Sequence, residues 1–290
     1  MNVKVVTDST ADLPPWLVQE LGISVVPLHI HVGEETFQDG VSISTEGFYN
    51  LLTGGDILPK TSAPSSGMFT EVYERLAQET DQIISIHISK KLSATYASAL
   101  VGTEGVETPC RIELVDSLQA SIGTGVLVVE AARLAKEGKT LDEILKATFD
   151  AVPRTQFVGV LDTLEYLHKG GRIGKAATFL GSMLNVKPIL SVREGIVHPV
   201  ERLRGRERAF DRLCEIVQSY GPLSSLAVAH TTTGDEMERL AERLSQFFPH
   251  DEILRTRCGA TLGTYLGPGA LCVALIHGPA EEIGGLPGFD

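Results

Sequence analysis

The amino-acid sequence predicts a protein of two α/β domains, with a mostly parallel sheet in the first domain and a mixed sheet in the second. Short apolar runs alternate with longer segments of helical periodicity, which is typical of parallel strands joined by helices. In the second half, two apolar runs flank Arg193-Glu194, which indicates a hairpin turn. The length of 290 residues also suggests two domains.

In the first half, β-rich runs and helical patterns follow each other in order. We expect strands at 3–6, 25–30, 82–88 and 111–115. We expect helices from Pro15 to Glu20 with Gly22 as the stop, from Ser44 to Gly54, and over 66–79, 119–137 and 141–152. The segment 119–137 is apolar nearly all round, so this helix is expected to be buried.

Pro153 ends the last of these helices, and we place the domain boundary beside it, so that the domains cover 1–155 and 156–290. In the second domain we expect strands at 157–161, 187–192, 195–200, 226–229, 253–256 and 270–276. Helices are expected over 176–184, 205–220 and 235–248.

The charge and the motif content exclude several classes of protein. A net charge of −12 argues against nucleic acid and against an anionic membrane surface as partners. No apolar run approaches the ~18 residues that span a bilayer, so no stable membrane insertion is expected. The four cysteines form no CxxC pair, which fits a reducing cytoplasm and no metal site. The sequence has no complete nucleotide-binding or hydrolase motif, so neither a cofactor nor a catalytic residue is expected.

Two hydroxyl-rich stretches, Thr61-Ser62-Ala63-Pro64 and Ser93-Ala94-Thr95, stand where helices are expected to begin. A helix start offers unpaired N–H groups and a positive dipole end, so two converging starts would hold one small anionic group. Taken alone, each stretch is better explained by an ordinary helix cap, and it is their occurrence together that indicates an anion site. Three further polar residues follow expected strands, at the edge where open α/β sheets keep their ligand crevice: Asp8, Ser9 and Asp116.

Seven motifs in order give the chain a resemblance to a known family. They are Val6-Thr7-Asp8-Ser9-Thr10-Ala11-Asp12-Leu13, Thr61-Ser62-Ala63-Pro64, Ile88-Ser89-Lys90-Lys91-Leu92-Ser93-Ala94-Thr95-Tyr96, Val115-Asp116-Ser117, Leu167-His168-Lys169-Gly170-Gly171-Arg172-Ile173, Leu184-Asn185-Val186-Lys187-Pro188-Ile189-Leu190 and Gly267-Pro268-Gly269. Together they resemble the DegV family, whose members include the FakB-type fatty-acid-binding proteins. The resemblance spans the whole chain.

The resemblance implies two α/β domains with a long-chain fatty acid bound between them and no other cofactor. Thr61 and Ser93 would bind the carboxylate, with Ser62 and Thr95 beside them in the same stretches. The crevice would be supported by Asp8, Ser9, Asp116, Arg172, Tyr265 and Gly267. Arg172 would pair with an acid such as Asp8, although a plain turn arginine fits the sequence equally well.

The acyl chain would run into the second domain. The candidates for its cavity are Phe179, Leu180, Met183, Leu184, Ile189 and Leu190, each of which an ordinary core position explains as well. The family presents its fatty acid to a separate kinase subunit, which makes the acyl phosphate that feeds phospholipid synthesis. Arg202, Arg204 and Arg206 would form the docking surface for that kinase. The alternative is that these arginines belong to an ordinary solvent-exposed face on which acidic residues lie among them.

The chain departs from the family pattern at two positions. Tyr265 stands in the segment before Gly267 where the family commonly has a histidine, so a neutral phenol replaces a titratable imidazole. Ala94 stands where a glycine is usual, and its methyl group fits if the local φ is negative.

Two other functions stay open from the residues. An enzyme, a hydrolase or phosphotransferase, would use Ser62 or Ser93 as its nucleophile. A nucleophile needs an adjacent base, and the sequence has no histidine near either serine. The third hypothesis is that the protein is a sensor of another anionic amphiphile.

Overall fold

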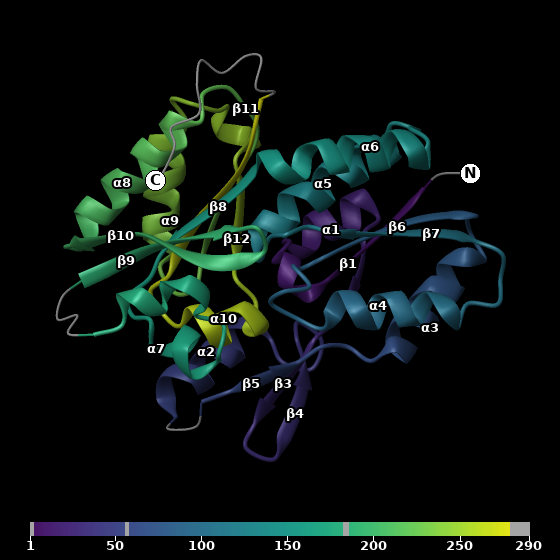
Figure 1. Cartoon of the computed structure of the whole chain (residues 1–290), viewed down its shortest axis with the longest axis horizontal. Coiled ribbons are helices and arrows are strands. Elements are labelled where there is room, and N and C mark those ends of the chain that lie inside the picture. The colour runs from purple at the N-terminus through teal and green to yellow at the C-terminus, as the bar shows by residue number, and fades with distance from the viewer. Residues whose placement is uncertain (1–2, 56–57, 182–185, 279–290) are drawn as a thin grey trace.

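Two main β-sheets organise the chain (Figure 1). The computed structural model describes residues 3–55, 58–181 and 186–278. The first sheet is parallel and has the order β2-β1-β6-β7. Its strands are β1 (Lys4–Asp8), β2 (Ser24–Val26), β6 (Gln82–His87) and β7 (Arg111–Asp116). The parallel sheet expected for the first domain is therefore present.

The second sheet is mixed and has the order β10-β9-β8-β13-β11-β12. Its strands are β8 (Thr155–Val160), β9 (Val186–Arg193), β10 (Ile196–Arg204), β11 (Leu223–His230), β12 (Leu254–Arg257) and β13 (Leu271–His277). Only β11 and β12 run parallel, and the other neighbours pair antiparallel. The mixed sheet confirms the predicted fold class, while the boundary at 155/156 stays a prediction.

Helices cover both faces of the first sheet. They are α1 (Pro15–Leu21), α3 (Ser66–Ala77), α4 (Thr95–Glu104), α5 (Ile122–Lys136) and α6 (Leu141–Ala151). Helix α2 (Thr45–Gly54) makes its main contacts outside this sheet. Helix α3 contacts β2 and β6, and α5 contacts β1 and β6 as well as β8, β11 and β13 of the second sheet. Helix α5 thus lies between the sheets, which is why its sequence is apolar nearly all round (Figure 1).

The second half adds α7 (Glu165–Lys169), α8 (Arg206–Ser219), α9 (Gly234–Leu244) and α10 (Ala260–Leu266). Four short 3₁₀ segments complete the described chain: η1 (Ser9–Ala11), η2 (Val152–Arg154), η3 (Gly174–Phe179) and η4 (His250–Glu252). Helices α8 and α9 pack on the second sheet, whereas α10 lies against α2 and α7 (Figure 1). None of the helices in the described ranges is both long and apolar enough to cross a bilayer.

Three expectations need correction. The segment 176–184 is not an α-helix where it is described, because only the 3₁₀ turn η3 forms there. The expected strand 25–30 is broken at Pro27, which has no N–H to donate, and splits into β2 and β3 (His29–Val32). Strand β3 joins β4 (Glu35–Gln38) and β5 (Lys60–Ser62) in a small antiparallel sheet that the sequence reading missed.

The hairpin turn between β9 and β10 falls at Glu194-Gly195, one residue later than expected. Both residues have positive φ, 49° and 79°, as a two-residue hairpin turn requires. The Ser89 hydroxyl donates to the carbonyl of Gly195 over 2.9 Å, and the Lys91 ammonium donates to the carbonyl of Glu194 over 2.8 Å. The turn of the second sheet is therefore tied to the loop that follows β6.

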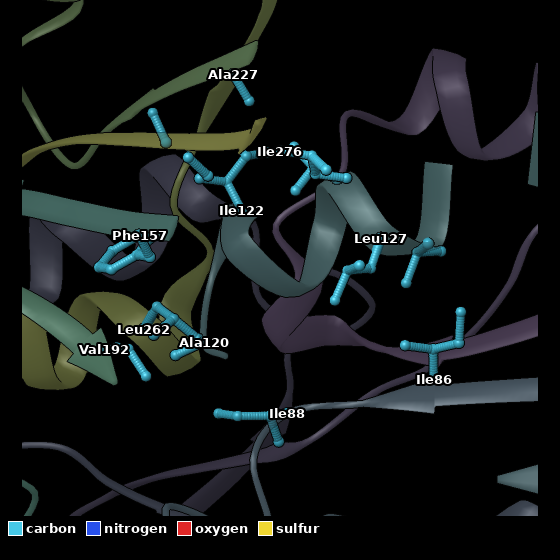
Figure 2. Close-up of a cluster of buried hydrophobic side chains, with 14 of the residues drawn as sticks. Ile86, Ile88, Ala120, Ile122, Leu127, Phe157, Val192, Ala227, Leu262 and Ile276 are labelled. Carbon is cyan, nitrogen blue, oxygen red and sulfur yellow. The ribbon is translucent and has the colours of Figure 1, made fainter. Parts of the chain in front are cut away.

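One buried apolar cluster spans the two sheets and α5 (Figure 2). Ile86 comes from the first sheet, Ile122 and Leu127 from α5, and Ala227 and Ile276 from the second sheet. Because this shared core fixes the sheets relative to each other, a site between them has a defined shape.

Candidate functional site

A cavity lies where the carboxyl end of β6 meets β8, β9 and α10. The space inside it, counted out into the solvent at its open mouth, is about 930 Å³. Its walls are mainly apolar and include Ile88, Phe157, Leu190, Val192 and Leu262. In Figure 2, Phe157, Val192, Leu262 and Ala120 point toward one another, with Ile88 beside them. The cavity therefore suits an apolar ligand.

Polar side chains also line the cavity, and three of them contact one another. The Thr61 Oγ1 lies 2.6 Å from the hydroxyl of Tyr265, within hydrogen-bonding distance. The Arg172 guanidinium lies over the Tyr265 ring, 5.3 Å from its centroid. Ser93 also lines the cavity, and its Oγ lies 2.8 Å from Thr95 Oγ1. Hydroxyl donors and a permanently charged guanidinium can hold a carboxylate.

Close packing at glycines brings Tyr265 and Arg172 into place. A Cβ on Gly170 would come within 2.6 Å of the Tyr265 ring, so only glycine fits beside it. The Arg172 Nη1 donates to the Gly170 carbonyl over 2.9 Å, and its Nε donates to the Leu92 carbonyl over 3.3 Å. Gly267 does not line the cavity; it ends α10 with φ of 69°.

Ser62 stands apart from Thr61, although both border the cavity. Successive residues of a strand point to opposite faces, and Ser62 Oγ lies 2.9 Å from Nε2 of His31 rather than near Tyr265. Ser62 also does not cap a helix as expected. Helix α3 begins four residues later, and its cap is Ser65, whose Oγ accepts from the Met68 N–H.

The contact between Ser62 and His31 places a histidine beside one of the two candidate serines. The Nδ1 of His31 lies 2.9 Å from Thr36 Oγ1, so the ring has neutral hydroxyl neighbours on both nitrogens. Sequence reasoning missed this histidine because 31 residues separate it from Ser62, and only the pairing of β3 with β5 joins them.

Asp8 does not pair with Arg172. Its Oδ2 lies 2.8 Å from Nδ1 of His87, and both side chains are fully buried. The chain of contacts continues from His87 Nε2 to Ser85 Oγ and from there to the Tyr73 hydroxyl. The Asp8 carboxylate also accepts from the N–H and the hydroxyl of Thr10, which lines the cavity. Asp8 thus supports the cavity wall from behind.

Three other expected residues, Ser9, Asp116 and Thr95, lie near the cavity without lining it, whereas Ala94 is part of its wall. The Ser9 hydroxyl accepts from the Leu28 N–H over 3.1 Å. The Asp116 carboxylate accepts from the Leu118 N–H over 3.0 Å. Thr95 is buried beneath Ser93, to whose Oγ its N–H donates over 3.3 Å, and Ala94 has φ of −75°, which its methyl group tolerates.

Of the six candidates for the acyl cavity, Leu190 is a lining residue. Ile189 points to the opposite face of β9 and packs with α8. Phe179 lies under the Arg202 guanidinium, and Leu180 is 42% exposed. Met183 and Leu184 lie outside the described residues. Sequence reasoning missed most of the wall, since Phe157, Val192 and Val197 come from the second sheet, and Leu262 and Leu266 come from α10.

The three arginines proposed as a docking patch differ in their surroundings. Arg206 forms ion pairs with Glu236 at 2.5 Å and Asp162 at 3.4 Å. Arg202 stacks on Phe179 at 5.0 Å. Arg204 is exposed at the end of β10.

Helix α10 is held by two buried carboxylates that come from the first half. The Gly259 N–H donates to Asp12 Oδ1 over 2.7 Å, and the Ala260 and Thr261 N–H groups donate to the two oxygens of Asp39 over 3.0 and 3.1 Å. Burial raises the pKa of Asp12 to about 8 and also raises the pKa of Asp39. No cluster of three or more His, Cys, Asp or Glu side chains in the described part of the chain could hold a metal ion.

Comparison with known proteins identifies the family. A family model described as "Uncharacterised protein, DegV family" matches residues 2–278. The chain belongs to the DegV family. It is 34% identical to Protein DegV of Bacillus subtilis over 275 residues, which cover 93% of this chain and 98% of that protein.

Solved structures resemble this DegV-family chain over almost its full length. One is described as "Fatty Acid Binding of a DegV family Protein from Thermus thermophilus". It has a TM-score of 0.88 and 32% identity, and the match covers 96% of this chain and 100% of the other. The structure of DegV, a fatty acid binding protein from Bacillus subtilis, has a TM-score of 0.85 and 32% identity, with the same coverage.

Proposed function

We propose that this DegV-family chain binds a long-chain fatty acid and presents its carboxylate to a separate fatty acid kinase, which makes the acyl phosphate for phospholipid synthesis. The observation that carries the proposal is one cavity whose mainly apolar wall also contains the contacting side chains of Thr61, Tyr265 and Arg172, together with Ser93. The two similar structures described as fatty-acid-binding support the same ligand.

Energetic considerations support a fatty acid over a small polar anion. A tail of about fourteen methylenes offers on the order of 11 kcal/mol at ~0.8 kcal/mol per buried CH₂, before the costs of association. A hydrogen bond to a charged group adds about 1.5–3 kcal/mol. The tail thus supplies most of the affinity, and the polar side chains of the cavity decide which end of the ligand lies beside them.

The chain itself serves as a carrier rather than a catalyst in this proposal. Thr61 Oγ1 contacts the Tyr265 hydroxyl and Ser93 Oγ contacts Thr95, and within the described part of the chain neither hydroxyl hydrogen-bonds to an imidazole or a carboxylate. Hydroxyls in such surroundings act as hydrogen-bond donors and not as activated nucleophiles. Phosphoryl transfer to the carboxylate then belongs to the partner, and both proteins would act in the cytoplasm.

Native mass spectrometry of the purified chain tests the ligand. A co-purified C14–C18 fatty acid is the expected result, and an empty protein or a bound phosphorylated metabolite would contradict the proposal. The kinase step is tested by adding a fatty acid kinase and ATP to the loaded chain. Acyl phosphate is expected only when the kinase, ATP and the loaded chain are all present.

A hydrolase is the second candidate function, and one observation favours it. Ser62 Oγ lies 2.9 Å from a ring nitrogen of His31, which is the arrangement of a nucleophile and its base. The other ring nitrogen faces Thr36 rather than a carboxylate, which would orient the ring and stabilise its protonated form. Hydrolysis of p-nitrophenyl esters that disappears in Ser62→Ala and in His31→Gln would support this function over the carrier.

A further inference from the structure

Helix α10 is too short to be stable by itself, yet it forms part of the cavity wall. It has seven residues, and its cap residue Gly259 has no side chain to satisfy the first N–H groups. Asp12 and Asp39 accept those N–H groups instead, from a segment more than 200 residues earlier in the chain. The beginning of α10 therefore depends on the first half of the protein.

Asp39 is held in the position from which it accepts the first N–H groups of α10. Its own N–H donates to the Leu28 carbonyl over 2.9 Å, and its side chain is buried. Both carboxylate oxygens are used, one for Ala260 and one for Thr261. A Cβ on Gly259 would come within 3.2 Å of Asp39 Oδ1, so the glycine lets the carboxylate approach the helix.

The middle of α10 packs too closely against α2 for the helix to shift. A Cβ on Gly263 would come within 2.7 Å of the Phe48 ring and of the Tyr49 hydroxyl, so the helix lies directly on α2. The Tyr49 hydroxyl donates to the carbonyl of Cys258 over 3.0 Å, just before the helix begins. These contacts link the position of the last turn to that of the first.

The last turn of α10 carries the group that contacts Thr61. Tyr265 places its hydroxyl 2.6 Å from Thr61 Oγ1, while Leu262 and Leu266 line the apolar part of the cavity. A helix rises about 1.5 Å per residue, so Asp39 acts about 7 Å from Tyr265 along a rigid element.

We propose that Asp39 is a positioning residue for the head-group site: it fixes the beginning of α10 and thereby holds the Tyr265 hydroxyl against Thr61. This inference rests on the proposed function, because the head group in question is the fatty-acid carboxylate. In Asp39→Asn one oxygen is left to accept one of these two buried N–H groups, and the amide NH₂ faces the other, so the first turn must move or open to find a new acceptor. Tyr265 then leaves its place beside Thr61.

The test measures the affinity for palmitate of Asp39→Asn, of Tyr265→Phe and of the double variant. Asp39→Asn is expected to weaken binding at least tenfold. In the Tyr265→Phe background the same change is expected to cost less than twofold, because the hydroxyl that Asp39 positions is already gone. Unchanged affinity in Asp39→Asn, or losses that multiply in the double variant, would overturn the inference.

Glu143→Ala is the matched control. It removes the carboxylate that completes the capping box at the start of α6, far from α10. It is expected to destabilise the fold without weakening palmitate binding, so an equal loss of affinity would mean that any weakened cap has this effect. If Asp39→Asn does not fold, Asp39→Glu replaces it with the same expected loss of affinity, since it keeps both acceptor oxygens but moves them by one methylene group.

Amide hydrogen exchange on the ligand-free chain tests the positioning role of Asp39 separately from the proposed fatty-acid binding. Asp39→Asn is expected to speed exchange across 260–266, and Glu143→Ala is expected to speed it across 141–151 only. A wild-type chain that binds no palmitate contradicts the proposed function. Unchanged exchange across α10 in Asp39→Asn contradicts the positioning role, whatever the ligand.

Discussion

Removing the two hydroxyls that we propose to face the ligand head group should weaken fatty-acid binding without abolishing it. The double variant Thr61→Val with Ser93→Ala keeps the shape of both side chains closely while deleting their hydrogen-bond donors. Thr61 lies beside Tyr265, and Ser93 lies in the loop before α4, so the variant affects two separate segments.

The magnitude follows from an exchange of partners. In the free protein Thr61 and Ser93 already contact Tyr265 and Thr95, and such neutral hydrogen bonds contribute about 0.5–1.5 kcal/mol each. With a carboxylate they would contribute about 1.5–3 kcal/mol each. The net loss is about 2 kcal/mol for the pair, or roughly 30-fold in affinity at ~1.4 kcal/mol per tenfold. The tail contribution, on the order of 11 kcal/mol, is untouched, so measurable binding remains.

Isothermal titration with palmitate and with its methyl ester measures this effect. The acid should bind the variant about 10- to 30-fold more weakly, and the ester, which lacks the charge, should bind nearly as it does to the wild type. Thr103→Val with Ser219→Ala is the control, since these hydroxyls donate to carbonyls of their own helices outside the cavity. Unchanged palmitate affinity in a folded double variant would refute the reasoning.

Three further outcomes are expected. Val192→Asp places a charge in the apolar wall, so palmitate binding should fall at least 100-fold. The variant should still fold, because the free-energy cost of this charge is expected to be smaller than the free energy of unfolding. Retained affinity in the same titration would contradict the cavity assignment. Because the pKa of Asp12 is raised to about 8, the folded state holds its proton more tightly than the unfolded state, and stability should fall by up to ~1.4 kcal/mol per pH unit between about pH 4 and 8. Urea unfolding at several pH values should show a flatter dependence for Asp12→Asn, and an equal slope would count against the burial of this carboxyl. Arg204→Glu should slow kinase turnover on the loaded chain while Lys139→Glu does not, and equal rates would remove Arg204 from the docking surface.

Local sequence patterns predicted most of the elements but not the third sheet. The stripe over 141–152 became α6, and the all-round apolar segment became α5, because the periodicity of a helix shows in its own residues. The small sheet was missed because each of its strands has at most four residues and is recognisable only by its partners. The cap of α3 was placed at Ser62 rather than Ser65 because both serines precede the same helix.

The sequence alone determined the α/β class, the alternation of strands and helices, and the hydroxyls Thr61 and Ser93 at the cavity, since these follow from short-range periodicity and from motif resemblance. The tertiary structure decided in which direction these side chains point and which residues they contact. Side chains alternate along a strand, so Ser62 and Thr61 point to opposite faces. Asp8 pairs with His87 instead of Arg172, and Tyr265 contacts Thr61 although 204 residues separate them in the sequence. Contacts of that separation arise from packing of the whole chain, so no local pattern records them.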